Sequence, residues 1–277
     1  MSDRRDVLIT VDELKDALAG GEAVQVLDVR WGLGAEASAG RAAYLEGHIP
    51  GARYCDLETV LTGPTADPAL GRHPLPGADQ LAAGLGALGI HSGLPVVVYD
   101  EPGSFAAGRA WWTLRWAGLD ARVLDGGLPA WVVSGGELET GEVPVEPTTL
   151  ALTTGHMPTI TADEAEQFPG TLIDARTADR FQGLSEPIDP MAGHIPGAVN
   201  RPVPGFFAAD GTLPDEQTVR NLLALPSDEP VAVYCGSGVS ACQLVLALAS
   251  VGVDAALYPP SWSGWSSDLS RPVAVGD

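Results

Sequence analysis

The sequence predicts an α/β protein of two tandem domains, each with a mainly parallel β-sheet flanked by helices. Three observations support this prediction. The chain has 277 residues, more than one typical domain. Short apolar runs of the kind found in strands alternate with helix-like segments. The second half also repeats the first, because the segment G-H-I-P-G-A occurs unchanged at 47–52 and at 193–198.

Each half is expected to begin with a helix followed by a strand. In both 10–13 and 161–164 a Thr is followed three residues later by a Glu. This spacing predicts a capping box, in which the two side chains satisfy free N–H groups at the start of a helix. The apolar runs that end in Asp28 and in Asp174 then predict a strand in each half.

The next repeated element distinguishes the two halves. A proline followed by an apolar run leads to Asp100 in the first half and to Cys235 in the second. Such runs are typical of buried parallel strands, and helices are expected after them over about 108–117 and 238–251. Because ligands bind beyond the carboxyl ends of parallel strands, Cys235 is the candidate nucleophile, and Asp100 occupies the same position without a thiol.

The segment 142–158 is rich in proline and threonine and is expected to be a linker. The first domain then spans 1–141 and the second 159–277. We expect the first domain to be catalytically inactive, since it has Asp100 at the cysteine position.

Composition excludes several classes of function. The formal charge of −21 argues against nucleic-acid or anionic-membrane partners. No apolar run approaches the ~18 residues needed to cross a bilayer. The apolar stretch of a signal peptide is missing from the start of the chain, and three cysteines do not make a disulfide framework, so a reducing cytoplasm is expected. No zinc-ligand spacing or phosphate-binding loop occurs, so neither a metal nor a cofactor is expected.

The segment 235–240, C-G-S-G-V-S, joins the predicted strand to a helix. Gly236 and Gly238 allow successive N–H groups to converge on an anion, and the N-terminus of the helix adds a positive dipole. Both stabilise a thiolate, the reactive form of cysteine. Cys235 as an inert buried thiol is the alternative. Cys242 is expected to pack in the core, with a resolving role as the alternative, and Cys55 is expected to pack.

Together, the tandem repeat, the two G-H-I-P-G-A segments and the single cysteine after the second strand resemble the two-domain rhodanese family. The resemblance covers about residues 8–265. It implies an inactive first domain, an active second domain and an active site between them. It further implies that Cys235 takes sulfur from a small anionic donor as a persulfide and passes it to a thiophilic acceptor. A small thiol, cyanide or a reducing protein such as thioredoxin could serve as that acceptor.

The loop C-G-S-G-V-S is similar to the C-G-S-G-V-T of 3-mercaptopyruvate sulfurtransferases rather than to the C-R-K-G-V-T of the thiosulfate enzymes. The resemblance therefore favours 3-mercaptopyruvate as donor, with thiosulfate:cyanide sulfurtransfer as the alternative. It implies that Ser237 and His48 relay a proton to the departing enolate, although His48 could instead be structural like His194. Donor binding is assigned by the resemblance to Arg180, Gly236, Gly238, Val239 and Ser240.

The sequence departs from the family pattern at three places. Ile188-Asp189 follows Glu186-Pro187 where the mercaptopyruvate enzymes usually have an arginine. The acidic partner expected before His48 is absent, and Glu36 is the nearest candidate. The tail of the second half has Pro259-Pro260 instead of Asp-Gly.

Two other classes of protein are alternatives to a sulfurtransferase. A cysteine phosphatase would need an arginine six residues after Cys235 to grip phosphate, and that position is Ala241. A non-catalytic redox-sensing or binding module remains the alternative from a different class.

Overall fold

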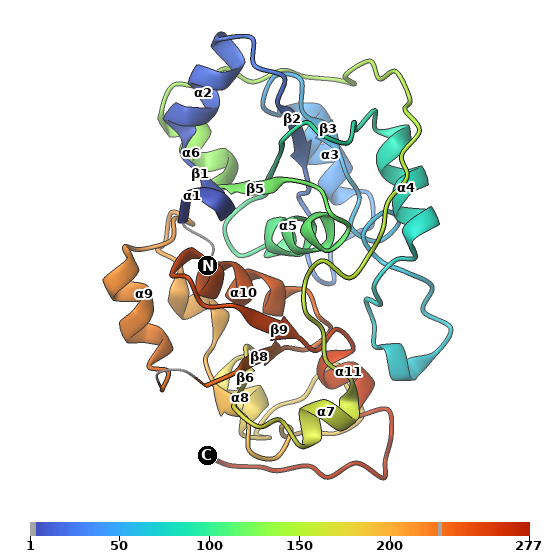
Figure 1. Cartoon of the computed structure of the whole chain (residues 1–277), viewed down its shortest axis with the longest axis vertical. Coiled ribbons are helices and arrows are strands. Elements are labelled where there is room, and N and C mark those ends of the chain that lie inside the picture. Colours follow the sequence, from blue (N-terminus) through green and yellow to red (C-terminus); the bar gives the residue numbers. More distant parts are fainter. Residues whose placement is uncertain (1–3, 227–228) are drawn as a thin grey trace.

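Two parallel sheets organise the chain, which confirms the predicted fold class. The computed structural model describes residues 4–226 and 229–277 (Figure 1). The first sheet has five strands in the order β1-β5-β4-β2-β3, and the second has four in the order β7-β6-β8-β9. All neighbouring strands pair in parallel.

Four strands of the first sheet have counterparts at the same positions in the second sheet, and β1 is the additional strand of the first. The first sheet contains β1 (Leu8–Ile9), β2 (Gln25–Asp28), β3 (Arg53–Tyr54), β4 (Val96–Tyr99) and β5 (Ala121–Leu124). The second contains β6 (Thr171–Asp174), β7 (Val199–Asn200), β8 (Val231–Tyr234) and β9 (Ala255–Leu257). Asp28 pairs with Tyr99 and Asp174 with Tyr234, so Asp100 and Cys235 follow equivalent strand ends.

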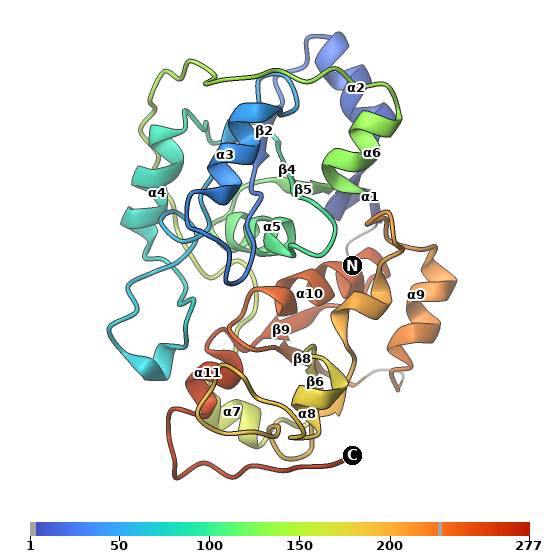
Figure 2. The ribbon, with the colours of Figure 1, turned by 180° about the vertical axis from the view of Figure 1, so that it is seen from behind.

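Helices surround both sheets (Figure 2). Those of the first domain are α1 (Arg4–Val7), α2 (Val11–Ala19), α3 (Ala39–Glu46), the 3₁₀ helix η1 (Pro68–Leu70), α4 (Ala78–Ala87), α5 (Ala106–Trp116) and α6 (Gly127–Val133). Those of the second are α7 (Ala162–Glu166), α8 (Ala178–Phe181), the 3₁₀ helix η2 (Val203–Phe206), α9 (Glu216–Leu223), α10 (Ser240–Ser250) and α11 (Ser261–Trp265). Both predicted capping boxes are confirmed, at the starts of α2 and α7.

Helices α5 and α10 pack against each other between the two sheets (Figure 1). Gly108 allows this close approach, because a Cβ atom there would lie 2.7 Å from the Cα of Gln243. Buried residues of both helices, among them Trp112 and Leu244, belong to one continuous core. The two domains therefore share a core rather than meeting only through polar surfaces.

The segment 142–158 contains no helix or strand. It is nevertheless fastened to the first domain, since the Thr148 N–H donates to Gly86 O (2.9 Å) and the His156 N–H to Trp116 O (3.1 Å). Within the described residues, no helix is long and apolar enough to cross a membrane.

Candidate active site

Cys235 lies directly after β8, and only 1% of its surface is exposed. The Gly238 N–H donates to its Sγ over 3.2 Å. The hydroxyl of Ser261, at the start of α11, lies 4.0 Å from the same sulfur, and its oxygen accepts the Cys235 N–H (3.1 Å). Gly238 has φ +81°, a conformation that glycine adopts without strain. The sulfur thus faces hydrogen-bond donors, which stabilise a thiolate.

A cavity of about 310 Å³ opens over this loop, between the two domains. The second domain contributes Arg180 and the loop itself, whose lining members are Cys235, Gly236, Ser237, Val239 and Ser240. The first domain contributes Trp31, Arg72, Ser104 and Phe105. The cavity has room for a small molecule in reach of the cysteine, and neither domain encloses it alone.

The histidine beside this cavity is His73, not the predicted His48. His73 Nδ1 lies 2.7 Å from Ser237 Oγ, and His73 Nε2 lies 3.3 Å from Glu58 Oε1. The Trp31 indole N–H donates to the same carboxylate oxygen over 2.9 Å and so fixes its position. The three side chains form a carboxylate–imidazole–hydroxyl chain that ends two residues from Cys235.

Burial lowers the pKa of His73, and the positive charges of Arg109 and Arg72 add to this effect against the opposing charge of Glu58. The imidazole is therefore neutral at neutral pH. A neutral imidazole has one nitrogen free to accept a proton from a hydroxyl. His73 can therefore exchange a proton with Ser237.

His48 occupies a structural position away from the cavity, so its expected partnership with Ser237 is wrong. Its Nδ1 lies 2.8 Å from Tyr44 O, its ring stacks on that of Tyr44, and its Nε2 lies 3.8 Å from Glu139 Oε2. His194 makes the equivalent contacts with Phe181, at 2.8 Å from the carbonyl and with stacked rings. The repeated histidine therefore holds the G-H-I-P-G-A turn in both domains.

Arg180 lies at the cavity, where the sequence predicted a donor-binding cation. Its Nη2 pairs with Glu186 Oε1 (2.7 Å) and with Asp189 Oδ2 (3.1 Å). Its Nη1 has no hydrogen bond to another described residue and lies 3.2 Å from where a Gly236 Cβ would be. The carboxylates hold the guanidinium in place and leave one end of it free to bind an anion.

Arg176 has a different role, although it also touches the cavity. It pairs with Asp174 (2.7 Å) and Glu186 (3.2 Å) and donates to Gly193 O (2.6 Å). Its guanidinium also stacks over Trp262. These contacts fix Arg176 at the end of β6 and give it a structural role.

Ser240 and Cys242 both lie in the first turn of α10, after the cysteine loop. Ser240 lines the cavity and is the first residue of α10, which begins after Val239 without a side-chain capping bond. Cys242 is fully buried and donates its S–H to Gly238 O (3.2 Å). Burial raises its pKa to about 12, so it stays a neutral thiol. Cys55 is also buried in the core.

Sequence reasoning also missed Arg109, which joins the two domains under the cysteine loop. Its guanidinium is 0% exposed and donates to Gly238 O (3.1 Å). It also donates to Leu61 O, His73 O and Pro74 O, at 3.0–3.1 Å. Arg109 therefore ties the backbone of the Cys235 loop to that of the His73 loop, which lies far away in the sequence.

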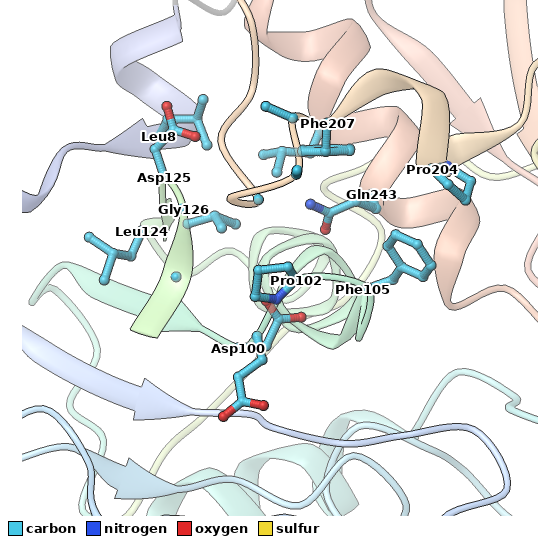
Figure 3. A pocket seen from close by; sticks show the side chains of 18 residues that line it. Leu8, Asp100, Pro102, Phe105, Leu124, Asp125, Gly126, Pro204, Phe207 and Gln243 are labelled. Atoms are coloured by element: carbon cyan, nitrogen blue, oxygen red, sulfur yellow. The ribbon is translucent and has the colours of Figure 1, made fainter. Parts of the chain in front are cut away.

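The equivalent place in the first domain has a cavity of about 320 Å³, lined by Asp100 and Phe105 and by Gln243 of the second domain (Figure 3). The Asp100 carboxylate accepts the Ala107 N–H (2.9 Å) at the start of α5. Burial raises the pKa of Asp100 to about 7. Its loop thus holds its own carboxyl group where the second domain has a thiol.

In the described part of the chain, no group of three or more His, Cys, Asp or Glu residues could hold a metal ion.

A buried thiol after a parallel strand, facing a cavity between two repeated α/β domains, defines the class as a cysteine-dependent enzyme with tandem domains. The profile of the Rhodanese-like domain matches residues 10–134 and 159–268. The chain belongs to the two-domain rhodanese family, and it is a sulfurtransferase of the thiosulfate and 3-mercaptopyruvate group.

Two full-length relatives carry the two names used in that group. Over 285 residues the chain is 46% identical to the Mycobacterium tuberculosis protein SseB, named as a thiosulfate sulfurtransferase, covering 100% of this chain and 99% of that one. It is 44% identical to a Pseudomonas aeruginosa protein named as a 3-mercaptopyruvate sulfurtransferase, with 98% of both chains covered. The crystal structure of the Escherichia coli 3-mercaptopyruvate enzyme SseA matches with a TM-score of 0.81 at 30% identity, covering 92% of this chain and 98% of that one.

Proposed function

We propose that this sulfurtransferase uses 3-mercaptopyruvate as its sulfur donor and carries the sulfur as a persulfide on Cys235. The observation that carries this proposal is the chain Glu58–His73–Ser237, which brings a proton-transferring hydroxyl to the cysteine loop. Mercaptopyruvate needs such a group because its leaving group is a carbon base. Thiosulfate does not, because sulfite leaves without taking a proton.

In the first half-reaction the Cys235 thiolate attacks the sulfur of mercaptopyruvate. The S–S bond of the persulfide forms as the C–S bond breaks, and the bonding electrons go to pyruvate enolate. The substrate thiol loses a proton and the enolate carbon gains one, so a proton moves from sulfur to carbon. The Ser237 hydroxyl and the neutral His73 can accept and return that proton. Arg180 binds the carboxylate through its free Nη1.

In the second half-reaction a nucleophilic acceptor, either a thiolate or cyanide, attacks the outer sulfur of the persulfide. The S–S bond breaks, its electrons return to Cys235, and the sulfur leaves on the acceptor. A small thiol, cyanide or a reducing protein such as thioredoxin would serve as acceptor in our proposal. The three free cysteines suit a reducing compartment, so the proposal places the enzyme in the cytoplasm.

Thiosulfate is the second candidate donor. Although the loop at 235–240 contains no cation, the guanidinium groups of Arg72 and Arg180 both approach Gly236. Positive charge beside the sulfur would stabilise departing sulfite.

Steady-state kinetics with each donor test the proposal. We expect a higher kcat/KM for mercaptopyruvate than for thiosulfate in the wild-type protein. We also expect the substitution Ser237→Ala to lower the mercaptopyruvate rate far more than the thiosulfate rate. A wild-type preference for thiosulfate, or an equal effect of Ser237→Ala on both donors, would contradict the choice of donor.

A further inference from the structure

We infer that Arg72 of the first domain is the second half of the donor-binding site: with Arg180 it forms a two-arginine anion subsite over Gly236. Nothing in the sequence pattern around Arg72 indicates such a role. The inference rests on the proposed function in one respect, the choice of a carboxylate as the anion.

The two guanidinium groups approach Gly236 from different domains. A Cβ on Gly236 would lie 3.2 Å from Arg72 Nη2 and 3.2 Å from Arg180 Nη1. Among the described residues, neither of these nitrogens has a hydrogen-bond partner. Two free N–H groups therefore meet beside the residue that follows the nucleophile, an arrangement suited to the two oxygens of a carboxylate.

Asp189 fixes the spacing between the two groups. One of its oxygens pairs with Arg72 Nη1 and the other lies 3.1 Å from Arg180 Nη2. The backbone of Arg72 is also anchored to the second domain, because its N–H donates to Ser263 Oγ over 3.1 Å. Arg72 is thus placed before any donor binds, which lowers the entropy cost of binding.

This arrangement explains a departure noted in the sequence. Ile188-Asp189 follows Glu186-Pro187 where an arginine is expected, and Ile188 is 45% exposed. The next residue, Asp189, instead recruits a guanidinium from the other domain. The second cation of the subsite is therefore supplied by Arg72, from a loop distant in sequence.

The charges around the subsite are balanced. Three guanidinium groups meet three carboxylates here: Arg72, Arg176 and Arg180 with Asp174, Glu186 and Asp189. A subsite without excess charge attracts anions mainly through directed N–H groups. It should therefore favour a carboxylate monoanion over a compact dianion such as thiosulfate.

Protection of Cys235 from alkylation measures this subsite without any turnover. The full-length protein is treated with iodoacetamide in the presence of pyruvate, which has the carboxylate but no sulfur to transfer, and modification of the Cys235 peptide is followed by mass spectrometry. We expect Arg72→Gln to weaken protection by pyruvate about 10- to 100-fold, the loss of one charge-assisted hydrogen bond, and Arg180→Gln to do the same. Sulfate should protect less well than pyruvate.

Arg41→Gln is the matched control, because Arg41 is an exposed arginine paired with Glu142 and its loss changes the net charge equally. It should leave protection unchanged. If Arg72→Gln does not fold, Arg72→Gln combined with Asp189→Asn removes the pair together. That double variant should still bind pyruvate more weakly than Asp189→Asn alone.

Each outcome decides a different point. Protection of Arg72→Gln equal to that of wild type overturns the subsite. If Arg72→Gln loses protection but the wild-type protein fails to turn over mercaptopyruvate, the subsite is retained and the proposed donor is overturned. Asp189→Asn removes one negative charge from the subsite and should therefore raise kcat/KM for thiosulfate relative to that for mercaptopyruvate. An unchanged or lower ratio would contradict the role given to the balanced charges.

Discussion

The two domains place nearly the same polar framework around two different strand ends. In the first, Arg30 pairs with Asp28 (2.7 Å) and donates to Gly47 O (2.7 Å). In the second, Arg176 pairs with Asp174 (2.7 Å) and donates to Gly193 O (2.6 Å). The framework is common to both domains, so it maintains the fold rather than the chemistry.

The domains differ in the loop after the central strand. In the first domain the carboxyl group of Asp100 accepts the helix N–H of Ala107, so the loop is occupied by its own side chain. In the second, Cys235 receives the Gly238 N–H, and a cavity lies over the sulfur. The comparison indicates that the loop of the second domain leaves room for a ligand beside its thiol, whereas the loop of the first domain is a structural turn that holds its own side chain.

The proposed mechanism still needs the first domain. His73 and Arg72 come from one of its loops, and Arg109 ties that loop to the cysteine loop. In our proposal, the domain without the catalytic cysteine thus supplies the proton relay and one cation. The active site belongs to the interface.

The largest effect should come from exchanging the nucleophile. Cys235→Ser should lower sulfur transfer by at least about a thousandfold with either donor, since a serine hydroxyl is a poor nucleophile toward sulfur. Cys242→Ser is the control and should keep most of the activity. Asp100→Cys should gain none, because no imidazole–serine pair lies beside that loop. A dead Cys242→Ser with an active Cys235→Ser would reverse the assignment.

The next effect separates the two kinds of histidine. His73→Gln should lower kcat for mercaptopyruvate about 10²- to 10⁴-fold, the usual contribution of a proton-transfer group, and should affect thiosulfate much less. His48→Gln should keep kcat but lower the free energy of unfolding by about 1–3 kcal/mol, because its buried bond to Tyr44 O is lost. Steady-state kinetics and thermal melts of both variants test the distinction. Similar kinetic losses in both would remove His73 from the relay.

Dependence on pH should sharpen this result. The pKa of His73 is lowered, so the neutral imidazole persists below the ordinary histidine pKa of about 6.5 and is lost as pH falls further. The ratio of the mercaptopyruvate rate to the thiosulfate rate should stay level down to about that pH and then decline. Taking the ratio cancels any effect of pH that is common to both donors. A ratio that already falls between neutral pH and 6.5 would contradict a neutral, buried His73.

The smallest expected effect concerns the inactive loop. The raised pKa of Asp100 means that the folded protein holds this proton more tightly than the unfolded chain. The stability linked to it is present below the unfolded pKa of about 3.9 and is lost as pH rises toward about 7. Asp100→Asn removes this loss, so its advantage over wild type should widen across that range, to about 1 kcal/mol or more, and then stay constant. Chemical denaturation at several pH values measures it; a constant difference would show that Asp100 is already charged.

The sequence was sufficient for the architecture because the repeat specifies it. Local sequence patterns account for the strand ends, for both capping boxes and for the glycines after α5 and α10. These two glycines have φ +81° and +74°. Cys235 and Arg180 lie near one cavity, as the loop pattern and the resemblance indicated.

His73 could not be found in the same way. It lies in the segment G-R-H-P-L-P, which has no counterpart in the second half, and it meets Ser237 only through packing between the domains. The resemblance assigned the relay to His48, in the first G-H-I-P-G-A segment, although the copy of that segment at His194 already pointed to a structural role for the histidine. A histidine outside the repeat was the only available signal.

The central claim is that Cys235 carries the sulfur, and mass spectrometry of the donor-treated protein tests it most directly. Wild-type protein is incubated with 3-mercaptopyruvate in the absence of an acceptor, and the free donor is removed. The masses of the intact chain and of its peptides are then measured. We expect a gain of one sulfur atom on the peptide that contains Cys235, and its loss when a thiol acceptor is added. A sulfur on Cys55 or Cys242, or none on any cysteine with either donor, would contradict the account.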